Sequence, residues 1–315
     1  MKIYMCDKNN PAVTIVTRTY NRPYLLERCI QSVLSLDYAS WNHVIVINSG
    51  DDKSVRSLVD KYEEAYAGRS LVIYLEDALP LGAAINVGIR ATHSDYIILL
   101  DDDDRLLPSS LSELVAEMCA APASLKAVHC NTSIVDESVF KNKIFHIGER
   151  PNPYQNKFVN VFNLLNDVNY TPVTFLFERS VLNQIGYFDE KPDSLPEWKF
   201  WVYLLSHVQI GFVDKTLATW HNRIRSSERN YIHSDAAALR RTYKEKYIQR
   251  KSVDPESNKI NEFVVLYLAT SAFAEPGLDK NIYFRKEDFN VFLLAFIKAL
   301  AGRVLRIIFR KSRRR

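Results

Sequence analysis

Four consecutive aspartates, Asp101 to Asp104, are the residues of this sequence with the strongest capacity for chemistry. They directly follow Tyr96–Leu100, a short apolar run that is β-branched in its middle and predicts a buried strand. Carboxylates packed this closely repel one another, and each loses hydration at the edge of a sheet. A hard divalent cation such as Mg²⁺ or Mn²⁺ relieves both penalties and leaves coordination positions open for substrate phosphates. The simpler alternative is a solvated acidic loop.

The segments around the aspartates alternate between strand and helix patterns. Besides 96–100, short apolar runs predict strands at 13–17, 43–47 and 71–75, and helical spacing predicts helices from Pro23, at 54–67 and at 81–91. This alternation over residues 11–130 predicts a mostly parallel sheet with helices on both faces. Because ligands bind at the carboxyl ends of the strands in such sheets, the aspartates lie at the expected binding edge.

Composition limits the broad class of protein. The 315 residues are 47% hydrophobic and 25% charged, which is ordinary for a globular protein large enough for one big domain or two modest ones. The four cysteines show no CxxC spacing, so neither a zinc site nor a disulfide framework is indicated. The first residues contain no apolar stretch of a secretory signal, and we therefore expect a cytoplasmic protein.

The formal net charge of +4 is unevenly distributed. From position 298 onward the chain carries eight basic residues and no acidic ones, so acidic residues outnumber basic ones in the rest of the chain. A basic tail on a mildly acidic body argues against a nucleic-acid-binding protein and for a localised anionic partner.

Several motifs, taken in order, resemble those of a known family. The first half carries Thr19-Tyr-Asn-Arg-Pro23 after the first strand, Gly82-Ala-Ala-Ile-Asn-Val-Gly88 in the third helix and Leu100-Asp-Asp-Asp-Asp104 at the end of the fourth strand. This half resembles the nucleotide-binding half of the family 2 glycosyltransferases, which have the GT-A fold. Residues Thr174–Glu190 resemble the strand and helix leading to their Gly-x-Phe-Asp-Glu turn, and Pro196–Trp201 resembles the segment that holds their catalytic carboxylate.

The resemblance covers about residues 11–230 and implies an α/β protein of the GT-A fold: a Rossmann-like, mostly parallel sheet flanked by helices, with a C-terminal helical extension. We expect a glycosyltransferase domain at 1–230, with a nucleotide-sugar half at about 1–130 and an acceptor half at about 131–230. Residues 231–315 would form the extension.

For the aspartates, the resemblance implies a DxD motif. Asp103 would be a direct ligand of Mn²⁺ or Mg²⁺, and Asp101 would face the ribose or the metal's waters. Asp102 would take the variable position of the motif beside the donor, and Asp104 would help to orient the site.

For catalysis, the resemblance implies a general base on the face of the sugar opposite the diphosphate. Glu197 is the candidate, although its place beside Pro196 also suits a purely structural first-turn charge. The family usually has Glu-Asp where this chain has Pro-Glu, and Asp193 is the reserve candidate. Trp198 is the candidate platform for stacking on an acceptor ring, with a core position as the alternative.

For donor binding, the resemblance points to residues after the strands and on the following helices. The expected nucleotide-sugar contacts are Thr19, Tyr20, Arg22, Asn48, Ser49, Asn86, Arg90, Asp101, Asp102 and Arg223. Ser49 stands where many members have an aspartate that contacts the base, and it can donate and accept hydrogen bonds but carries no charge. Uridine is still the expected base. An arginine at position 223, where the family has a histidine, can hold phosphate bidentately, and His221 lies two residues away.

The C-terminal segment, Phe289 to Phe309, has apolar residues on one side of a helical pattern and Lys298, Arg303, Arg306 and Arg310 on the other. Lys298 interrupts the apolar run too early for a membrane span. Such a basic amphipathic helix suits an anionic membrane surface; docking onto a protein partner is the alternative.

With these observations, the resemblance implies a metal-dependent, inverting hexosyl- or N-acetylhexosaminyltransferase. It would move a sugar from a nucleotide-diphosphate donor, with a UDP-sugar favoured, to a glycan or lipid-linked acceptor during polysaccharide biosynthesis at the inner face of the cell membrane. A nucleotidyltransferase, or a non-catalytic nucleotide-sugar or glycan binding module of the same fold, remains as an alternative.

Overall fold

The computed structural model describes residues 11–48, 53–153, 164, 170–192 and 195–224. The chain divides into two units, residues 1–244 and 245–315, and all the described residues lie in the first. The predicted C-terminal extension, with its basic amphipathic helix, lies outside the described residues.

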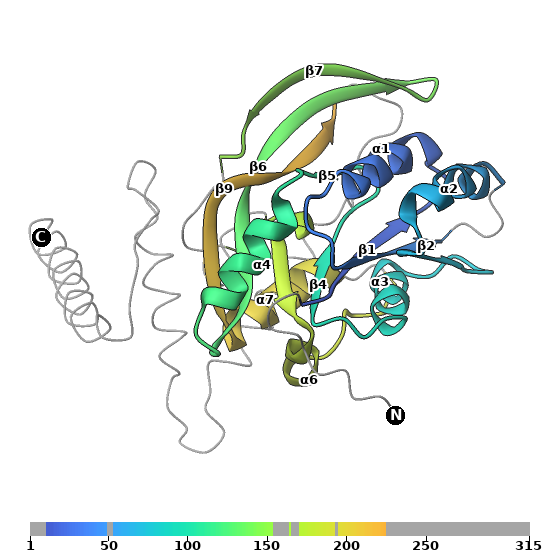
Figure 1. Ribbon diagram of the computed structural model, residues 1–315. Coiled ribbons are helices and arrows are strands. Elements are labelled where there is room, and N and C mark those ends of the chain that lie inside the picture. Colours follow the sequence, from blue (N-terminus) through green and yellow to red (C-terminus); the bar gives the residue numbers. More distant parts are fainter. Residues whose placement is uncertain (1–10, 49–52, 154–163, 165–169, 193–194, 225–315) are drawn as a thin grey trace, which may run out of the picture. The chain divides into compact units, whose positions relative to one another are not determined.

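The described residues form a nine-stranded mixed sheet in the order β3-β2-β1-β4-β8-β6-β9-β5, with β7 paired to β6 (Figure 1). The first four strands of this order are mutually parallel, whereas β8 runs antiparallel to both β4 and β6. Strand β9 is parallel to β6 and antiparallel to β5. The strand bounds are β1 Val13–Thr19, β2 Trp41–Ile47, β3 Ser70–Tyr74, β4 Tyr96–Leu99, β5 Arg105–Leu106, β6 Leu125–Phe140, β7 Lys143–Pro151, β8 Phe175–Glu178 and β9 Gln209–Arg223.

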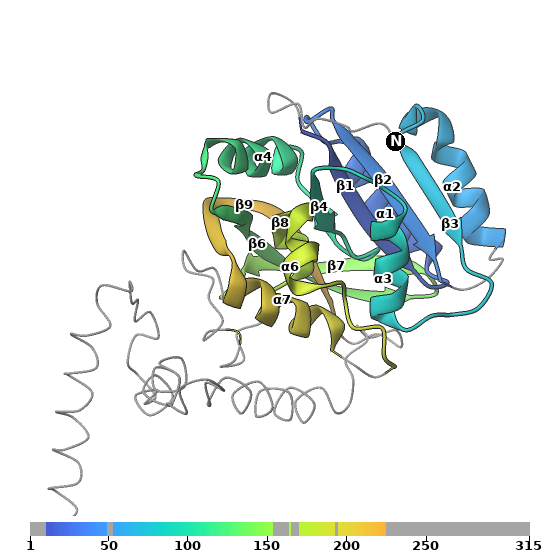
Figure 2. The same cartoon turned by 90° about the horizontal axis from the view of Figure 1, so that it is seen from below.

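Helices cover both faces of this sheet (Figures 1 and 2). The α-helices are α1 Pro23–Leu34, α2 Lys53–Tyr66, α3 Leu81–Arg90, α4 Ser110–Ala120, α6 Leu182–Ile185 and α7 Pro196–His207, with short 3₁₀ turns at Pro172–Thr174 and Arg179–Val181. Alternate residues of a strand face opposite sides of the sheet. Accordingly Ile45 and Ile47 of β2 pack in the cluster that includes α1, α2 and α4, whereas Val44 and Val46 pack with α3. The strands buried on both faces explain the continuous apolar runs in the sequence.

Helix α3 packs unusually closely against the sheet because it carries glycine. A Cβ built on Gly88 would lie 2.6 Å from Cγ1 of Val16 in β1. A side chain there would force the helix away from the strand.

The α/β fold predicted from the sequence is confirmed. The four strands and three helices expected over residues 11–100 all form, with end points shifted by a few residues. The long β6–β7 hairpin was not predicted. The parallel pairing of β6 with β9 was not predicted either, because it joins segments far apart in the chain. Within the described part of the chain, no helix combines the length and the apolar character that a membrane span requires.

Candidate active site

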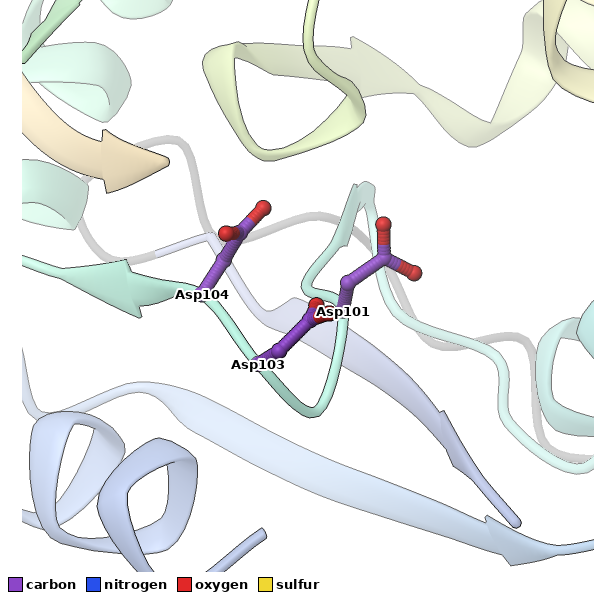
Figure 3. A group of neighbouring side chains, drawn as sticks. All are labelled: Asp101, Asp103 and Asp104. Carbon is purple, nitrogen blue, oxygen red and sulfur yellow. The ribbon is translucent and has the colours of Figure 1, made fainter. Parts of the chain in front are cut away.

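The loop that follows β4 brings three carboxylates together at the carboxyl end of the parallel strands. The backbone N–H of Asp104 donates a hydrogen bond of 3.0 Å to the carbonyl of Asp101, which folds the loop back on itself. One carboxylate oxygen each from Asp101, Asp103 and Asp104 lie within 4.8 Å of one another (Figure 3). Converging carboxylates of this kind are ligands that Mg²⁺ and Mn²⁺ prefer. Asp104, expected only to orient the site, is part of this group.

Asp102 is not part of this group and is fully buried. Its carboxylate accepts hydrogen bonds from the hydroxyl of Thr19, at 2.7 Å, and from Nε of Arg22, at 3.1 Å, and it also forms an ion pair with Nη2 of Arg22. The bidentate pair ties the end of β1 to the loop after β4. Thus Thr19, Arg22 and Asp102, all predicted to contact the donor, are bonded to one another.

Three guanidinium groups surround the other aspartates. Nη2 of Arg223 lies 2.7 Å from Oδ2 of Asp103, and Nη1 of Arg22 lies 3.5 Å from the same oxygen. Nη2 of Arg18 lies 3.5 Å from Oδ1 of Asp101. These arginines stabilise the carboxylates by their opposite charge and place positive groups beside the cluster.

The pKa values of the three clustered carboxyl groups are shifted in different directions. Burial raises the pKa of Asp104 well above its usual range, and the charges of Asp103 and Asp101 raise it further. Burial also raises the pKa of Asp101, against the opposing charge of Arg18. For Asp103, burial alone would raise the pKa, but Arg22 and Arg223 outweigh it and the pKa is lowered. A cluster that resists full ionisation by itself is the electrostatic setting in which a divalent cation is favourable, so the residues present fit a metal.

Glu197 lies in the first turn of α7, near enough to the cluster that, besides burial, the charges of Asp101 and Asp103 raise its pKa. Burial raises the pKa of Glu197 to about 7, and the negative charge of Asp101 contributes to this rise. Helix α3 fixes the start of α7: a Cβ built on Gly82 would lie 2.0 Å from the carbonyl oxygen of Asp189 and 2.9 Å from Cβ of Pro196. Only glycine at position 82 therefore permits the turn before Glu197 to approach this closely.

Asn86 and Arg90, expected to face the diphosphate, instead bind the turn that leads to α7. The amide of Asn86 is fully buried, donates to the carbonyl of Phe188 at 2.9 Å and accepts from the N–H of Phe188 at 3.1 Å. Nη1 of Arg90 lies 2.9 Å from Oε1 of Glu190, and the side-chain N–H of Asn86 donates to the same oxygen at 2.8 Å. Burial and saturation of its hydrogen bonds give Asn86 a positioning role here, which differs from the direct contact expected.

The remaining predicted residues fall in three kinds of environment. Tyr20 is 54% exposed at the end of β1, where its ring is accessible to a ligand. The side chain of Asn48 is bonded to both backbone groups of Leu79 and holds the approach to α3. Trp198 is 8% exposed, so its ring is mostly core, which differs from the platform expected. Ser49 and Asp193 lie outside the described residues.

His221 belongs to the site through its backbone. Its N–H donates to Oδ1 of Asp104 at 2.9 Å, and its buried ring has a pKa lowered to about 3, chiefly by burial and then by the charge of Arg28. It therefore remains a neutral imidazole at physiological pH.

Arg28 and Glu137 were missed by sequence reasoning. Arg28, on α1, donates to the backbone carbonyl of Asp103 and bonds to Glu137 at 2.6 Å. Glu137 is buried on β6, next to Arg223 in the β6–β9 register. No sequence signal marks this link, because Arg28 and Glu137 are 109 positions apart in the chain and meet only when α1 packs against the sheet.

A cavity of about 830 Å³ lies at the other end of β4, away from the aspartates. Its lining includes Asp95 and Tyr96 at the start of the strand and Arg179. Arg179 is bonded to the carbonyls of Ser94 and Ile89 and supports the backbone there.

Comparison with solved structures identifies the class of fold. Staphylococcus aureus TarS residues 1–349, solved in complex with UDP-GlcNAc, superposes with a TM-score of 0.62 at 16% identity, covering 91% of this chain and 81% of that one. The mannosyltransferase PcManGT from Pyrobaculum calidifontis, solved with GDP-Man and Mn²⁺, superposes with a TM-score of 0.55 at 16% identity, covering 86% and 72%. The fold is that of the GT-A glycosyltransferases.

The sequence comparison then gives the family. The model of the family "Glycosyl transferase family 2" matches residues 14–186, more than half of the chain, and the protein belongs to this family. The uncharacterized glycosyltransferase YwdF of Bacillus subtilis (strain 168) is 26% identical over 192 residues, which are 60% of this chain and 66% of YwdF. In two other curated relatives, the matching segment covers only 23% and 38% of the relative's own length.

Proposed function

We propose that this protein is an inverting glycosyltransferase that moves a hexosyl or N-acetylhexosaminyl group from a UDP-sugar to a hydroxyl of a glycan or lipid-linked glycan. The observation that carries the proposal is the position of Glu197. It is a half-buried carboxylate whose pKa is raised to about 7, first by burial and then by Asp101, a member of the acidic cluster. A general base is most effective when its pKa lies near the working pH.

In the proposed reaction, Glu197 takes the proton of the acceptor hydroxyl as its oxygen attacks the anomeric carbon. The new carbon–oxygen bond forms as the bond from that carbon to the diphosphate breaks, and the electron pair leaves with the nucleoside diphosphate. Attack from the face opposite the leaving group inverts the anomeric configuration. Negative charge develops on the diphosphate as it leaves, and positive groups held at the acidic cluster have to stabilise it.

Asp101, Asp103 and Asp104 are the residues that would hold a divalent cation, Mn²⁺ or Mg²⁺, and such an ion supplies neutralisation of the departing diphosphate when bound. The Mn²⁺ complex of the archaeal neighbour supports this assignment by analogy of fold. Arg223 and Arg18, which border the cluster, would bind the phosphate oxygens.

In this proposal, some residues contact the donor directly and others hold the residues of the site in place. Tyr20 would stack against the base, and Ser49 is kept from the sequence as a further proposed contact of the donor. Thr19 and Arg22 would act through Asp102, which they hold. The UDP-GlcNAc and GDP-Man complexes of the two structural neighbours support a nucleotide-sugar as the ligand class.

The proposal also includes where in the cell the protein acts on its acceptor. We assign the protein to polysaccharide biosynthesis in the cell envelope, on the cytoplasmic side of the membrane and peripherally bound to it. The sequence pattern of residues 289–315, basic on one helical side and apolar on the other, supports an anionic lipid surface as one partner.

The test compares donor binding with turnover. Thermal-shift measurements with a panel of nucleotide-sugars, with and without Mn²⁺, should show a cation-dependent rise in Tm for the cognate donor. With that donor, release of nucleoside diphosphate should be rapid for the native protein and nearly absent for Glu197→Gln, while donor binding is retained. Cation-dependent binding without any release by the native protein, across a panel of acceptors, would favour the non-catalytic alternative.

A further inference from the structure

The β6–β7 hairpin presents an outward face that is unusually apolar for its exposure. Phe140, Phe145 and Ile147 have 64%, 49% and 52% of their surface exposed, and they are three of the seven large exposed hydrophobic side chains among the described residues. Phe140 is the cross-strand partner of Lys143, and alternate residues share a face, so Phe145 lies on the same side as Lys143. Ile147 is the extra residue at a register shift opposite Asp136 and Glu137, and it joins this set by its exposure. Val139, on the other side, is buried. We call the set of Phe140, Lys143, Phe145 and Ile147 the hairpin face.

The tip of the hairpin is positively charged. Residues 138–148 include Lys141, Lys143 and His146 and contain no acidic residue. Lys141 and Asn142 have positive φ values of 49° and 58°, which make the tight turn that suits a two-residue hairpin and hold Lys141 at the tip. The ammonium of Lys141 lies 5.5 Å from the centre of the Phe140 ring. Aromatic and aliphatic side chains beside lysines are the combination that binds at the boundary of an anionic lipid layer.

The base of the hairpin is linked to the acidic cluster. Glu137, three residues before Phe140, bonds to Arg28, which in turn donates to the backbone carbonyl of Asp103. Since a strand rises about 3.3 Å per residue, the tip at Lys141 extends about 13 Å beyond Glu137. In Figure 1 the hairpin projects beyond the rest of the sheet.

We propose that the hairpin face docks onto an anionic membrane surface. Phe140, Phe145 and Ile147 enter the boundary between head groups and acyl chains, and Lys141 and Lys143 bind lipid phosphates. Such docking holds the acidic cluster a short distance above the bilayer, within reach of an acceptor anchored in it. This inference extends beyond the proposed reaction, and its test does not depend on which donor the protein uses.

The first experiment is sedimentation of the full chain with phosphatidylcholine vesicles, prepared with and without phosphatidylglycerol. Binding should require the anionic lipid. Replacing both Lys141 and Lys143 by alanine should weaken partitioning about 30-fold, since each surface-bound lysine contributes on the order of 1 kcal/mol. Phe145→Ser should also weaken it, whereas Leu71→Ser, at a residue 41% exposed on the distant strand β3, should bind like the native protein.

A second experiment measures contact of the hairpin with lipid separately from any contact made by the C-terminal tail. An indole introduced by Phe145→Trp should be quenched by brominated lipids in anionic vesicles, relative to the native protein, and one introduced by Leu71→Trp should not. Native-like partitioning of the lysine variant together with an unquenched indole at position 145 would overturn the proposal. So would a dimer in vesicle-free solution that dissociates on Phe145→Ser, since it would assign the face to a second copy of the chain.

Discussion

Replacing Glu197 by glutamine tests both the chemistry and the electrostatics of the site. Because the pKa of this carboxyl is raised from 4.5 to about 7 by burial and by Asp101, the folded protein binds its proton more tightly than the unfolded chain does. The stability that the protonated carboxyl contributes is therefore complete below the unfolded value and is lost as the pH rises through about 7. Above that pH, the ionised carboxylate destabilises the fold.

The magnitude follows from the size of the shift. One pKa unit corresponds to about 1.4 kcal/mol, so a shift from 4.5 to about 7 corresponds to about 3 kcal/mol for a fully desolvated group. Because the Glu197 side chain is only half-buried, solvent screening reduces this to about 1–3 kcal/mol. Glutamine has a similar shape and cannot ionise. Glu197→Gln should thus raise the free energy of unfolding by that amount at about pH 8, and by less than about 1 kcal/mol at about pH 5.

The same substitution should abolish turnover. Removing a general base costs about 10²–10⁴-fold in rate, so Glu197→Gln should release nucleoside diphosphate at least about 100-fold more slowly while binding the donor normally. In the native protein, kcat/KM should rise as the pH passes through about 7 and the base ionises; a bound cation would lower that midpoint.

The assay is urea unfolding in EDTA at the two pH values, combined with single-turnover kinetics. Glu149→Gln, an exposed glutamate of β7, serves as the control and should change stability by no more than about 0.5 kcal/mol. If Glu197→Gln slows turnover but leaves the free energy of unfolding at about pH 8 unchanged, the carboxylate of Glu197 is not in desolvated, negative surroundings. An active Glu197→Gln would refute its role as the base.

Three further substitutions test how the site is held. Thr19→Val removes a hydrogen bond from the fully buried Asp102 and should lower the free energy of unfolding by about 1–3 kcal/mol in urea titrations at neutral pH; an unchanged midpoint would contradict the proposed support of the loop. Gly82→Ala places a methyl group against the carbonyl of Asp189 and should lower kcat about 10–100-fold with circular dichroism unchanged, since it displaces the start of α7; full activity would show that the turn yields freely. Asp103→Asn should lower turnover about 100-fold or more and abolish the Mn²⁺-dependent rise in Tm with donor; a native-like Mn²⁺ response would exclude Asp103 as a ligand.

Much of the site was predictable because its parts are local in the sequence. The carboxylates of Asp101, Asp103 and Asp104 converge because the residues are adjacent and follow a strand whose buried, β-branched pattern is unmistakable. The first-turn position of Glu197 likewise follows from Pro196 and the helical spacing after it. The fold class could be predicted for the same reason, since it depends on periodicity within short segments.

What the sequence alone determined was which chemistry-bearing residues come at the ends of which elements. The tertiary structure alone decided which of them face the cluster and which hold it in place. Asp102 is turned inward to Thr19, and Asn86 is bonded to Phe188, through contacts between residues 83 and 102 positions apart. Glu137 is linked to the site through Arg28, which lies 109 positions away in the chain. Contacts across such separations depend on the packing of the whole sheet, so no local pattern of residues encodes them.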